Sequence, residues 1–430
     1  MMNKINVLIF PAEGENAIEL HNALSYCVNI CVFGASSVSR GGEYVFSRYT
    51  DKMPFITDDN FVDEFVKYIA FNNIDCIFPT HDTVAQFLAN IADRIPAKLI
   101  MGDQFTVNIC RSKIKTHETF AEYDFTPIRY KNINDLKYPA FMKPDIGEGG
   151  HNTKKIDENF KETIDFENNL VTEYLPGQEI TIDCLTDRYG KLIYISPRSR
   201  DGILGGICVL GHNIPLSEEI RSIANVINER LNFLGLWYFQ MRADKQGKYK
   251  LMEISSRAAG TMCLTRSKGI NLPLLSVYTA FGYDIEAQDN GNNVSMHRSL
   301  VGKYDLHMEY TTVYIDFDDT ITHNGTVNPV AMAYLYQCKN KGIKIALLTR
   351  HEKQLYDSLK LYHIEKDLFD TIEWIGVDES KARVINRNMN GDKRCIFIDN
   401  AYKERIEVSK ECEIPTFDAD AFEFLYDWRV

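Results

Sequence analysis

The segment LMEISSRAAG, residues 251–260, says most about the first part of this chain. It follows GLWYFQMRADKQGKYK, in which Gly247 marks a turn between two apolar segments. We therefore expect residues 240–243 and 250–254 to pair as the strands of a β-hairpin. Because alternate side chains of a strand lie on one face, the polar residues of this hairpin are expected to share a surface.

That surface combines the residue types of a phosphate and metal site. Glu253 and Ser255 alternate along one strand, Gln240 lies on the partner strand, and Arg257 follows just beyond. Amide, carboxylate and hydroxyl oxygens suit Mg²⁺ that also binds phosphates, and arginine suits a phosphoryl group in transfer. An amphipathic hairpin with a solvated carboxylate has the same pattern, so the hairpin alone leaves both interpretations open.

Composition limits the class of protein. A length of 430 residues predicts two or three domains. The net charge of −12 argues against general binding to nucleic acid or to an anionic membrane. No apolar run is long enough to span a bilayer, and MMNKINVLIF is too short an apolar run for a signal peptide. The ten cysteines form no CxxC pair, so we expect reduced thiols in a cytoplasmic protein.

Apolar segments alternate with helical patterns near the N-terminus, at residues 6–10, 29–33, 75–79 and 98–101. This alternation predicts a parallel sheet with crossover helices, whose ligands bind at the carboxyl ends of the strands. The polar residues that follow these strands, and are candidates for the substrate side, are Glu13, Glu15, His81 and Asp82. Turn or cap chemistry explains each of them better when it is taken singly.

Two lysines lie near a glycine-rich segment. Residues 108–123 are predicted to form one helix that carries Lys113, and YPAFMKPDIGEGG, residues 138–150, places Lys143 before a glycine-rich turn. Glycines let backbone amides approach a phosphate, and a lysine adds a point charge. The GK[ST] ending of a P-loop is missing, and such turns often bind nothing.

The next segments suit a nucleotide and an anionic substrate. LVTEYLPGQEITIDC, residues 170–184, is predicted to be strand, turn and strand, with Glu173 and Glu179 flanking the turn. Backbone groups at a strand edge can face a purine, and carboxylates can accept from ribose hydroxyls. Arg198 and Arg200 precede several glycines and suit a carboxylate or phosphate substrate, although solvated edge charges would look the same.

The order of these motifs over residues 1–300 resembles the ATP-grasp superfamily, and within it the carbamoyl-phosphate-synthase-like carboxylate–amine ligases. The resemblance implies an α/β pre-ATP-grasp domain, residues 1–107, followed by an ATP-grasp domain of two α+β lobes, residues 108–304. It implies ATP and Mg²⁺ as cofactors, with Mn²⁺ as an alternative metal. Many of the resembled ligases dimerise, so a homodimer is included in this expectation.

The same resemblance implies a role for individual residues. The nucleotide would be held by Lys113, Lys143, Glu173, Tyr174, Leu175 and Glu179. The metal would be held by Gln240, Glu253 and Ser255, with Arg257 at the γ-phosphate and Arg198 and Arg200 at the substrate. Ser255 stands where the family usually has asparagine, which is a stronger ligand, so a looser second metal is expected.

After a polar stretch, a second group of residues suited to phosphate binding begins in TTVYIDFDDTIT, residues 311–322. Predicted strands end in Asp316 and Asp318, in Thr349 and in Asp399, and Lys381 opens a helix. Neighbouring carboxylates need a cation between them or a retained proton. Carboxylates, a hydroxyl and a lysine at strand ends form a set suited to phosphoryl groups and Mg²⁺.

These residues resemble the haloacid dehalogenase superfamily of phosphatases, whose DxDxT signature is complete at residues 316–320. The resemblance implies a Rossmann-like α/β domain over residues 305–430, without a cap domain because the intervals between motifs are short. It makes Asp316 the nucleophile and Asp318 the general acid/base, with Mg²⁺ on Asp316, Asp318 and Asp399. Asn400 replaces an acid that often follows Asp399, which predicts weaker metal binding.

The two resemblances together predict a bifunctional cytoplasmic enzyme. One half would join a small-molecule carboxylate to an amine through an acyl phosphate, forming ADP. The other half would remove phosphate from a small phosphorylated metabolite of the same pathway. An ATP-dependent kinase or phosphotransferase, and a ligase with a non-catalytic regulatory phosphatase-like domain, remain as alternatives.

Overall fold

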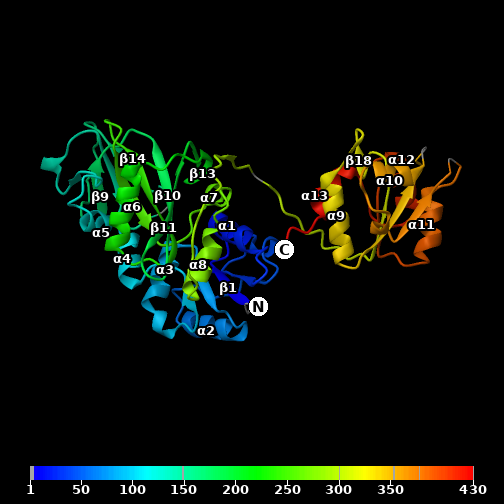
Figure 1. Cartoon of the computed structure of the whole chain (residues 1–430), viewed down its shortest axis with the longest axis horizontal. Coiled ribbons are helices and arrows are strands. Elements are labelled where there is room, and N and C mark those ends of the chain that lie inside the picture. Colours follow the sequence, from blue (N-terminus) through cyan, green and yellow to red (C-terminus); the bar gives the residue numbers. More distant parts are fainter. Residues whose placement is uncertain (1–3, 148–149, 300, 352–353, 377, 430) are drawn as a thin grey trace. The chain divides into compact units, whose positions relative to one another are not determined.

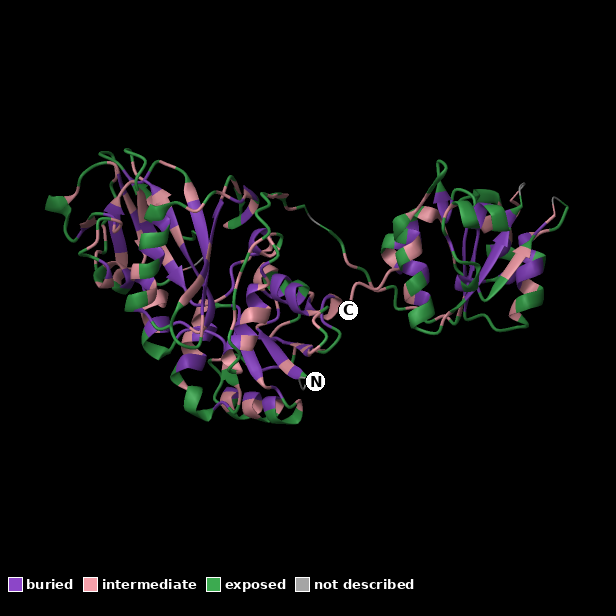
Figure 2. Cartoon of the chain, viewed as in Figure 1, coloured by how far each residue is buried: buried purple, intermediate pink, exposed green. Residues whose placement is uncertain are grey.

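The computed structural model describes residues 4–147, 150–299, 301–351, 354–376 and 378–429 (Figure 1). The chain forms two compact units, residues 1–300 (unit 1) and residues 301–429 (unit 2). In each unit the central strands are the most buried elements (Figure 2). Among the described residues, no helix has the length and apolar character needed to cross a membrane.

Unit 1 begins with a five-stranded sheet in the order β3-β2-β1-β4-β5, in which every pair is parallel. Its strands are β1 (Ile5–Phe10), β2 (Ile30–Ala35), β3 (Tyr49–Thr50), β4 (Cys76–Pro79) and β5 (Lys98–Leu99). Helices α1 (Gly14–Leu24), α2 (Phe61–Phe71) and α3 (Asp82–Asn90) connect them. The parallel sheet predicted from the alternating pattern is confirmed, and only the two-residue β3 was not expected.

The strand order explains why polar residues gather after β1 and β4. From β1 the chain moves to one side of the sheet, through β2 and β3, and it then returns to the other side at β4. Such a switch point leaves a crevice at the carboxyl ends of the two central strands. Helices α1 and α3 both start at this crevice, because each directly follows one of these strands.

Two four-stranded antiparallel sheets also belong to unit 1. The first has the order β6-β9-β7-β8 and consists of β6 (Arg129–Tyr130), β7 (Ala140–Pro144), β8 (Lys154–Ile156) and β9 (Asn169–Glu173). The second has the order β11-β10-β14-β15 and consists of β10 (Glu179–Thr186), β11 (Leu192–Ser199), β14 (Gly235–Ala243) and β15 (Tyr249–Ser255). The predicted hairpin at Gly247 is confirmed as β14 and β15.

A smaller sheet and five further α-helices also belong to unit 1. The sheet is built from β12 (Gly202–Leu204), β13 (Ile207–His212) and β16 (Ser295–His297). Helix α6 (Glu218–Arg230) follows β13, and α7 (Cys263–Arg266) and α8 (Leu272–Ala280) lie between β15 and β16 in sequence. The single helix predicted over residues 108–123 is wrong, because the structure has α4 (Gln104–Arg111) and α5 (Lys113–Thr119) instead. Ser112 leaves the helical conformation and accepts from the backbone N–H of Lys115 at 3.0 Å, so it caps a new helix.

Unit 2 is a second parallel sheet, in the order β21-β20-β17-β22-β23, with every pair parallel. Its strands are β17 (Thr312–Ile315), β20 (Lys344–Thr349), β21 (Thr371–Trp374), β22 (Cys395–Ile398) and β23 (Thr416–Phe417). Its helices are α9 (Pro329–Asn340), α10 (Leu355–Leu361), α11 (Lys381–Met389), α12 (Tyr402–Cys412) and α13 (Phe422–Leu425), and a short hairpin is formed by β18 (Thr322–His323) and β19 (Thr326–Val327).

Both faces of the unit 2 sheet are covered. Alternate residues of the central strand β17 belong to different apolar clusters, Val313 and Ile315 to one and Tyr314 to the other. This explains why the strand is a continuous apolar run rather than an alternating one.

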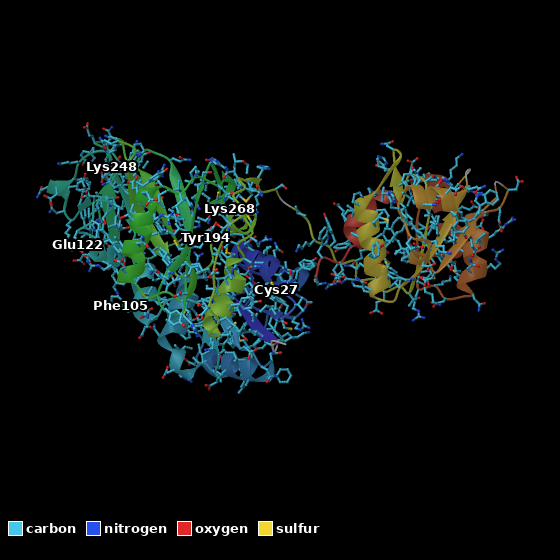
Figure 3. All side chains as sticks on the ribbon, in the orientation of Figure 1. Cys27, Phe105, Glu122, Tyr194, Lys248 and Lys268 are labelled. Carbon is cyan, nitrogen blue, oxygen red and sulfur yellow. The ribbon has the colours of Figure 1, made fainter. Side chains whose placement is uncertain are left out.

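All ten cysteines are free, among them Cys27, which is labelled with other side chains in Figure 3.

We expect Phe239→Ala to lower the free energy of unfolding of unit 1 by about 3–5 kcal/mol, because Phe239 of β14 is fully buried and its loss leaves a cavity. Urea unfolding followed by the fluorescence of the buried Trp237, in a Trp374→Phe/Trp428→Phe background, measures the change. Phe71→Ala is the matched control, since Phe71 is 85% exposed, and it should change stability by at most about 0.5 kcal/mol.

Candidate functional site

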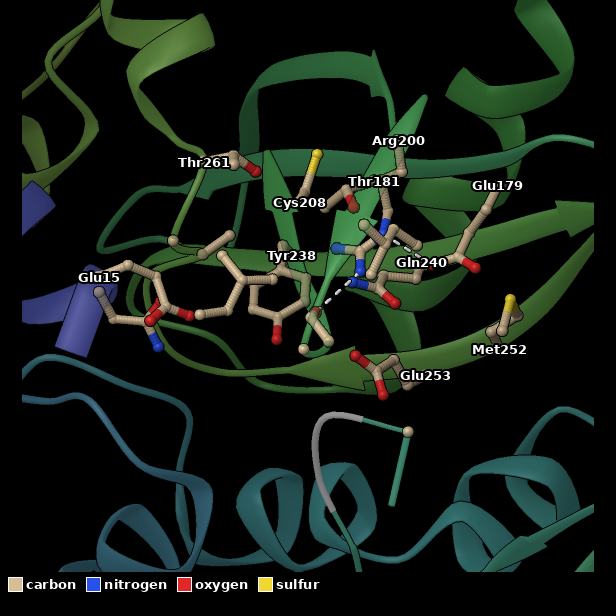
Figure 4. Close-up of a pocket in the computed structure, with 18 of the residues that line it drawn as sticks. Glu15, Glu179, Thr181, Arg200, Cys208, Tyr238, Gln240, Met252, Glu253 and Thr261 are labelled. Atoms are coloured by element: carbon tan, nitrogen blue, oxygen red, sulfur yellow. Dashed lines mark hydrogen bonds and ion pairs between the residues drawn. The ribbon is translucent and has the colours of Figure 1, made fainter. Parts of the chain in front are cut away.

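Unit 1 contains a cavity of about 680 Å³ that gathers residues from all parts of the unit (Figure 4). In Figure 4 the labelled residues run from Glu15 and Thr261 at one end, past Tyr238, to Glu179 and Met252 at the other. The residues predicted from sequence that line it are Glu13, Glu15, His81, Lys113, Lys143, Glu179, Arg198, Arg200, Gln240, Glu253 and Arg257. The fold therefore brings most of the expected nucleotide, metal and substrate residues to one place.

The first turn of α1 reaches this cavity through a close approach to the segment after β15. A Cβ atom on Gly260 would lie 2.4 Å from Cγ of Glu15 and 2.8 Å from Oδ1 of Asn16. Only glycine allows this contact, so Gly260 lets the crevice of the parallel sheet open into the same cavity as β14 and β15.

Gln240 and Glu253 are directly paired across β14 and β15. The Gln240 side-chain amide, in the orientation that satisfies its neighbours, donates to Oε1 of Glu253 at 3.2 Å and accepts from Nη1 of Arg200 at 3.2 Å. A β-bulge follows, because Met241 pairs with Leu251 and leaves Met252 unpaired. The bulge interrupts strict alternation, and Met252 and Glu253 both line the cavity.

Ser255 lies outside the cavity lining, unlike Gln240 and Glu253. Its hydroxyl is buried and donates to Oδ1 of Asp82 at 2.8 Å. Sequence alternation had placed Ser255 beside Glu253 as a metal ligand, whereas the structure gives its hydroxyl to the first residue of α3. The pairing is regular from Glu253 to Ser255, so the difference comes from the carboxylate of Asp82, which accepts the hydrogen bond of the Ser255 hydroxyl.

Asp82 also holds Arg257. The guanidinium donates to the carboxylate twice, from Nε at 3.0 Å and from Nη2 at 2.8 Å. Burial alone would raise the pKa of Asp82, but Arg257 and Ser255 outweigh burial and the pKa is lowered. Asp82 in turn raises the pKa of Arg257 against the effect of burial. The pair is therefore fully charged, and Arg257 is fixed beside the cavity.

The side chains that could bind a metal ion can be compared with the ligands that a cation requires. The described residues contain no group of three His, Cys, Asp or Glu side chains placed to hold a metal ion. Gln240 and Glu253 nevertheless offer an amide and a carboxylate oxygen on one cavity wall. Mg²⁺ commonly takes one or two protein ligands and completes its shell with phosphates and water. This pair fits a cation that arrives with a phosphorylated ligand.

The lysines are placed together by the start of α5. The Ser112 hydroxyl donates to Oδ1 of Asp145 at 2.7 Å, and Nζ of Lys113 donates to the carbonyl of Gly147 at 2.8 Å. Burial, together with the nearby charge of Lys113, lowers the pKa of Lys143 to about 8. Residues 148–149 of the predicted glycine-rich turn lie outside the described residues.

The expected nucleotide hinge lies beside the cavity rather than in its lining. The Glu173 carboxylate accepts from the backbone N–H of Ile128 at 3.0 Å, Leu175 is buried, and Tyr174 packs near Phe141 at 6.3 Å between ring centroids. Glu179 does line the cavity, and its carboxylate lies 2.7 Å from Nε of Arg200. Side chains of residues 173–175 are thus committed to packing, which leaves their backbone for other contacts.

Arg198, predicted as a substrate residue, is fully buried. Its guanidinium donates to Asp183 from Nε at 2.9 Å and from Nη2 at 3.0 Å, and Nη1 donates to the hydroxyl of Thr261. Thr265 also donates to Asp183, at 2.7 Å. The structure therefore gives Arg198 a supporting role in the cavity floor, since its nitrogens are bonded within the protein.

Comparisons with known proteins now define the fold of unit 1. Residues 165–299 match the family described as "ATP-grasp in the biosynthetic pathway with Ter operon". The chain is similar to the biotin carboxylase domain of Hydrogenobacter thermophilus 2-oxoglutarate carboxylase, with a TM-score of 0.54 and 16% identity over 67% of this chain and 72% of that one. That structure contains MgADP, ADP and bicarbonate.

Two further solved structures are similar. Biotin carboxylase from Campylobacter jejuni, in complex with β,γ-ATP, has a TM-score of 0.53 and 14% identity over 66% of this chain and 72% of that one. N5-carboxyaminoimidazole ribonucleotide synthetase, in complex with ADP, has a TM-score of 0.53 and 12% identity over 67% of this chain and 80% of that one. Unit 1 has the ATP-grasp fold. The ATP-grasp fold predicted from the motif order is confirmed.

Beyond the ATP-grasp unit, Lys381 connects the carboxyl ends of β17 and β22, which are adjacent strands of unit 2. Its ammonium donates to Oδ1 of Asp316 at 2.7 Å and to Oδ2 of Asp399 at 2.6 Å. Burial raises the pKa of Asp316 to about 7, with Asp399 adding to the shift and Lys381 opposing it. Thr349, at the end of β20, is buried at the same edge of the sheet. The structure brings these predicted residues together.

Asp318 is placed differently from Asp316. Both of its oxygens lie 2.9 Å from Nδ1 of His351, and Nε2 of His351 lies 2.7 Å from the Ser358 hydroxyl. The sequence prediction assigned Asp318 to the metal as well as to proton transfer, whereas the structure turns its carboxylate toward His351. Sequence reasoning missed His351, and its only signal was its position two residues after Thr349.

Asn400 connects to the DxDxT segment. Its backbone N–H donates to the hydroxyl of Thr320 at 3.0 Å, and its side-chain oxygen lies 3.5 Å from the same hydroxyl. Asp399 also accepts from the backbone N–H of Ala401 at 2.7 Å. These contacts hold the end of β22 against the segment that follows β17, so the Asp316 and Asp399 carboxylates remain close.

We expect Asp183→Ala to destabilise the ATP-grasp unit by about 3–5 kcal/mol, because it leaves the fully buried charge of Arg198 without its partner. The exposed pair of Arg188 and Asp284, 2.9 Å apart, supplies the matched control. Asp284→Ala should cost at most about 1 kcal/mol. Urea unfolding of both variants measures the difference, and equal costs would contradict the supporting role of Asp183.

Proposed function

We propose that the ATP-grasp unit is an ADP-forming ligase that joins a small-molecule carboxylate to an amine through an acyl phosphate. The observation that carries this proposal is the Gln240–Glu253 pair beside Arg257, in one cavity with Lys113 and Lys143. Oxygen ligands for a cation and cationic groups for phosphates are thereby combined, as phosphoryl transfer requires.

In this proposal Lys113 and Lys143 bind the phosphates of ATP, and Arg257, fixed by Asp82, faces the γ-phosphoryl group. Gln240 and Glu253 would hold Mg²⁺, or Mn²⁺ in its place, which when bound neutralises phosphate charge. The substrate carboxylate attacks the γ-phosphorus, the bond to the β,γ-bridging oxygen breaks, and ADP leaves. The amine then attacks the acyl carbon, and inorganic phosphate and a proton are released.

The rest of the nucleotide is proposed to lie toward Glu179 and Met252. The backbone after β9, at Tyr174 and Leu175, would face adenine, because the Glu173 and Leu175 side chains are already used in packing. The Glu179 carboxylate would face the ribose, and it would accept hydrogen bonds from the ribose hydroxyls while it remains paired with Arg200. Carboxylates accept readily from hydroxyl groups, which supports this assignment.

We propose that unit 2 is a phosphatase of the haloacid dehalogenase type that acts on a small phosphorylated metabolite. The supporting observation is the buried set of Asp316, Lys381 and Asp399 at adjacent strand ends. Asp316 attacks the phosphorus, Asp318 protonates the leaving oxygen, and Asp318 then accepts a proton from the water that hydrolyses the aspartyl phosphate. Asp316 and Asp399 would hold Mg²⁺, which lowers the charge repulsion against the phosphate.

We further propose that the two units act in one pathway, because they are parts of a single chain. The amide product of the ligase would carry a phosphate that unit 2 removes. Unit 2 contributes only the short β18–β19 hairpin after its DxDxT segment, so a separate cap domain is not present there among the described residues.

The first prediction from this function concerns proton uptake. We expect MgADP affinity to fall as the pH rises above about 8, by up to about tenfold per pH unit, because Lys143 loses its proton there. Phosphates raise its pKa again, so binding should take up a proton. Calorimetry in buffers of different ionisation enthalpy measures this uptake. Lys143→Met should bind more weakly at pH 7 and show neither the slope nor the uptake.

The second prediction tests both reactions. Wild type, Asp316→Asn and Glu253→Gln proteins are incubated with MgATP and a small-metabolite extract, and condensed products are sought by mass spectrometry. A phosphorylated amide should accumulate with Asp316→Asn, lack its phosphate with wild type, and be absent with Glu253→Gln. The reason is that Asp316 is needed only for phosphate removal and Glu253 only for ligation.

Other outcomes of this experiment are equally informative. A product without phosphate in both the wild type and Asp316→Asn samples would separate unit 2 from the pathway of the ligase. ADP formation without any condensed product, accompanied by a stable phosphorylated compound, would replace ligation by a kinase reaction.

A further inference from the structure

One cationic side chain of the ATP-grasp cavity has no role in the proposed reaction. Arg298 directly follows β16, lines the cavity, and donates from Nη2 to the carbonyl of Gly260. Gly260 precedes Thr261 and contacts Glu15, and Figure 4 places Thr261 and Glu15 on the side of Tyr238 away from Gln240 and Glu253. Arg298 therefore belongs to the end of the cavity opposite the proposed nucleotide.

The guanidinium of Arg298 is only partly used. Nη1 is buried and has no hydrogen-bond partner in the described part of the chain. The other arginines that line the cavity each have a carboxylate partner: Arg198 has Asp183, Arg200 and Arg242 have Glu179, and Arg257 has Asp82. Arg298 differs from all of them.

The carboxylate that feels the charge of Arg298 is already occupied. Arg298 lowers the pKa of Glu19, but burial and Arg266 have larger effects on it, and that pKa is raised overall. Arg266 donates to Glu19 from Nε at 2.9 Å and from Nη2 at 3.4 Å. Glu19 is thus bonded to another arginine, and the positive charge of Arg298 remains available to the cavity.

A buried guanidinium N–H that bonds to nothing is unfavourable, and arginine matches oxyanions better than any other side chain. We propose that Arg298 binds a non-reacting oxyanion, a carboxylate or a phosphate monoester, on one of the two substrates of the ligase. This inference rests on the proposed function, because it assumes that the reacting carboxylate lies near Gln240, Glu253 and Arg257. It makes Arg298 a specificity residue rather than a part of phosphoryl transfer.

The test uses the full chain and two simple probes, with and without the non-hydrolysable nucleotide MgAMPPNP, which occupies the γ-phosphate position. Inorganic phosphate is followed by ³¹P line broadening, and acetate by ¹H saturation transfer. With Arg298→Met, binding of at least one probe should weaken at least tenfold, while MgAMPPNP affinity stays within about twofold. Arg298→Lys, which keeps the charge, should recover part of the binding.

Arg242→Met is the matched control, because Arg242 lines the nucleotide end of the same cavity. It should leave binding of both probes unchanged.

Loss of phosphate binding alone identifies a phosphate monoester, loss of acetate binding alone identifies a carboxylate, and loss of both also supports the oxyanion site. Unchanged binding of both probes by Arg298→Met overturns the inference, and equal loss in Arg242→Met overturns it as well. Failure of wild type to bind MgAMPPNP would instead refute the proposed ligase, and the titrations without nucleotide would still test Arg298.

Discussion

The ion pair between Asp82 and Arg257 joins two parts of the fold that are 175 residues apart in sequence. Asp82 starts α3 at the crevice of the parallel sheet, and Arg257 follows β15 of the antiparallel sheet. A desolvated pair is favourable only when its hydrogen bonds are nearly complete, and here Ser255 supplies another donor to Asp82. Residues next to both sheets line the cavity, so its shape depends on this contact.

Unit 2 also contains buried charges that are stabilised by a side chain of opposite charge. Asp316 and Asp399 are buried at neighbouring strand ends, where two carboxylates would repel each other, and the ammonium of Lys381 lies between them. In both units, then, charges that suit a phosphate or a cation are held in place by opposite charges from a distant segment. Such preorganised charge does not have to be assembled when a ligand arrives.

Several features could be read from sequence because they depend on short-range rules. The apolar runs before Glu13 and His81 predicted a parallel sheet, and the turn at Gly247 predicted the hairpin that pairs Gln240 with Glu253. Other features could not. Strict alternation predicted Ser255 as a cavity ligand beside Glu253, but its hydroxyl is bonded to Asp82, which is 173 residues away in sequence. Likewise, the helical pattern through residue 112 hid a serine that ends one helix and caps the next.

By itself, the sequence determined the order of the elements, the ATP-grasp fold of the first unit and the residue types available for phosphate and cation binding. The order of the elements follows from periodicity and turn chemistry, which are properties of neighbouring residues. The ATP-grasp fold follows from a resemblance to that superfamily, carried by the order of motifs over residues 1–300. The tertiary structure decided which charges are free. Arg198 was predicted to face the substrate, yet it is bonded to Asp183, whereas Nη1 of Arg298, which the sequence did not single out, has no hydrogen-bond partner among the described residues. Both arginines also bond to the segment of Gly260 and Thr261, which lies far from each of them in sequence and whose position no local pattern contains.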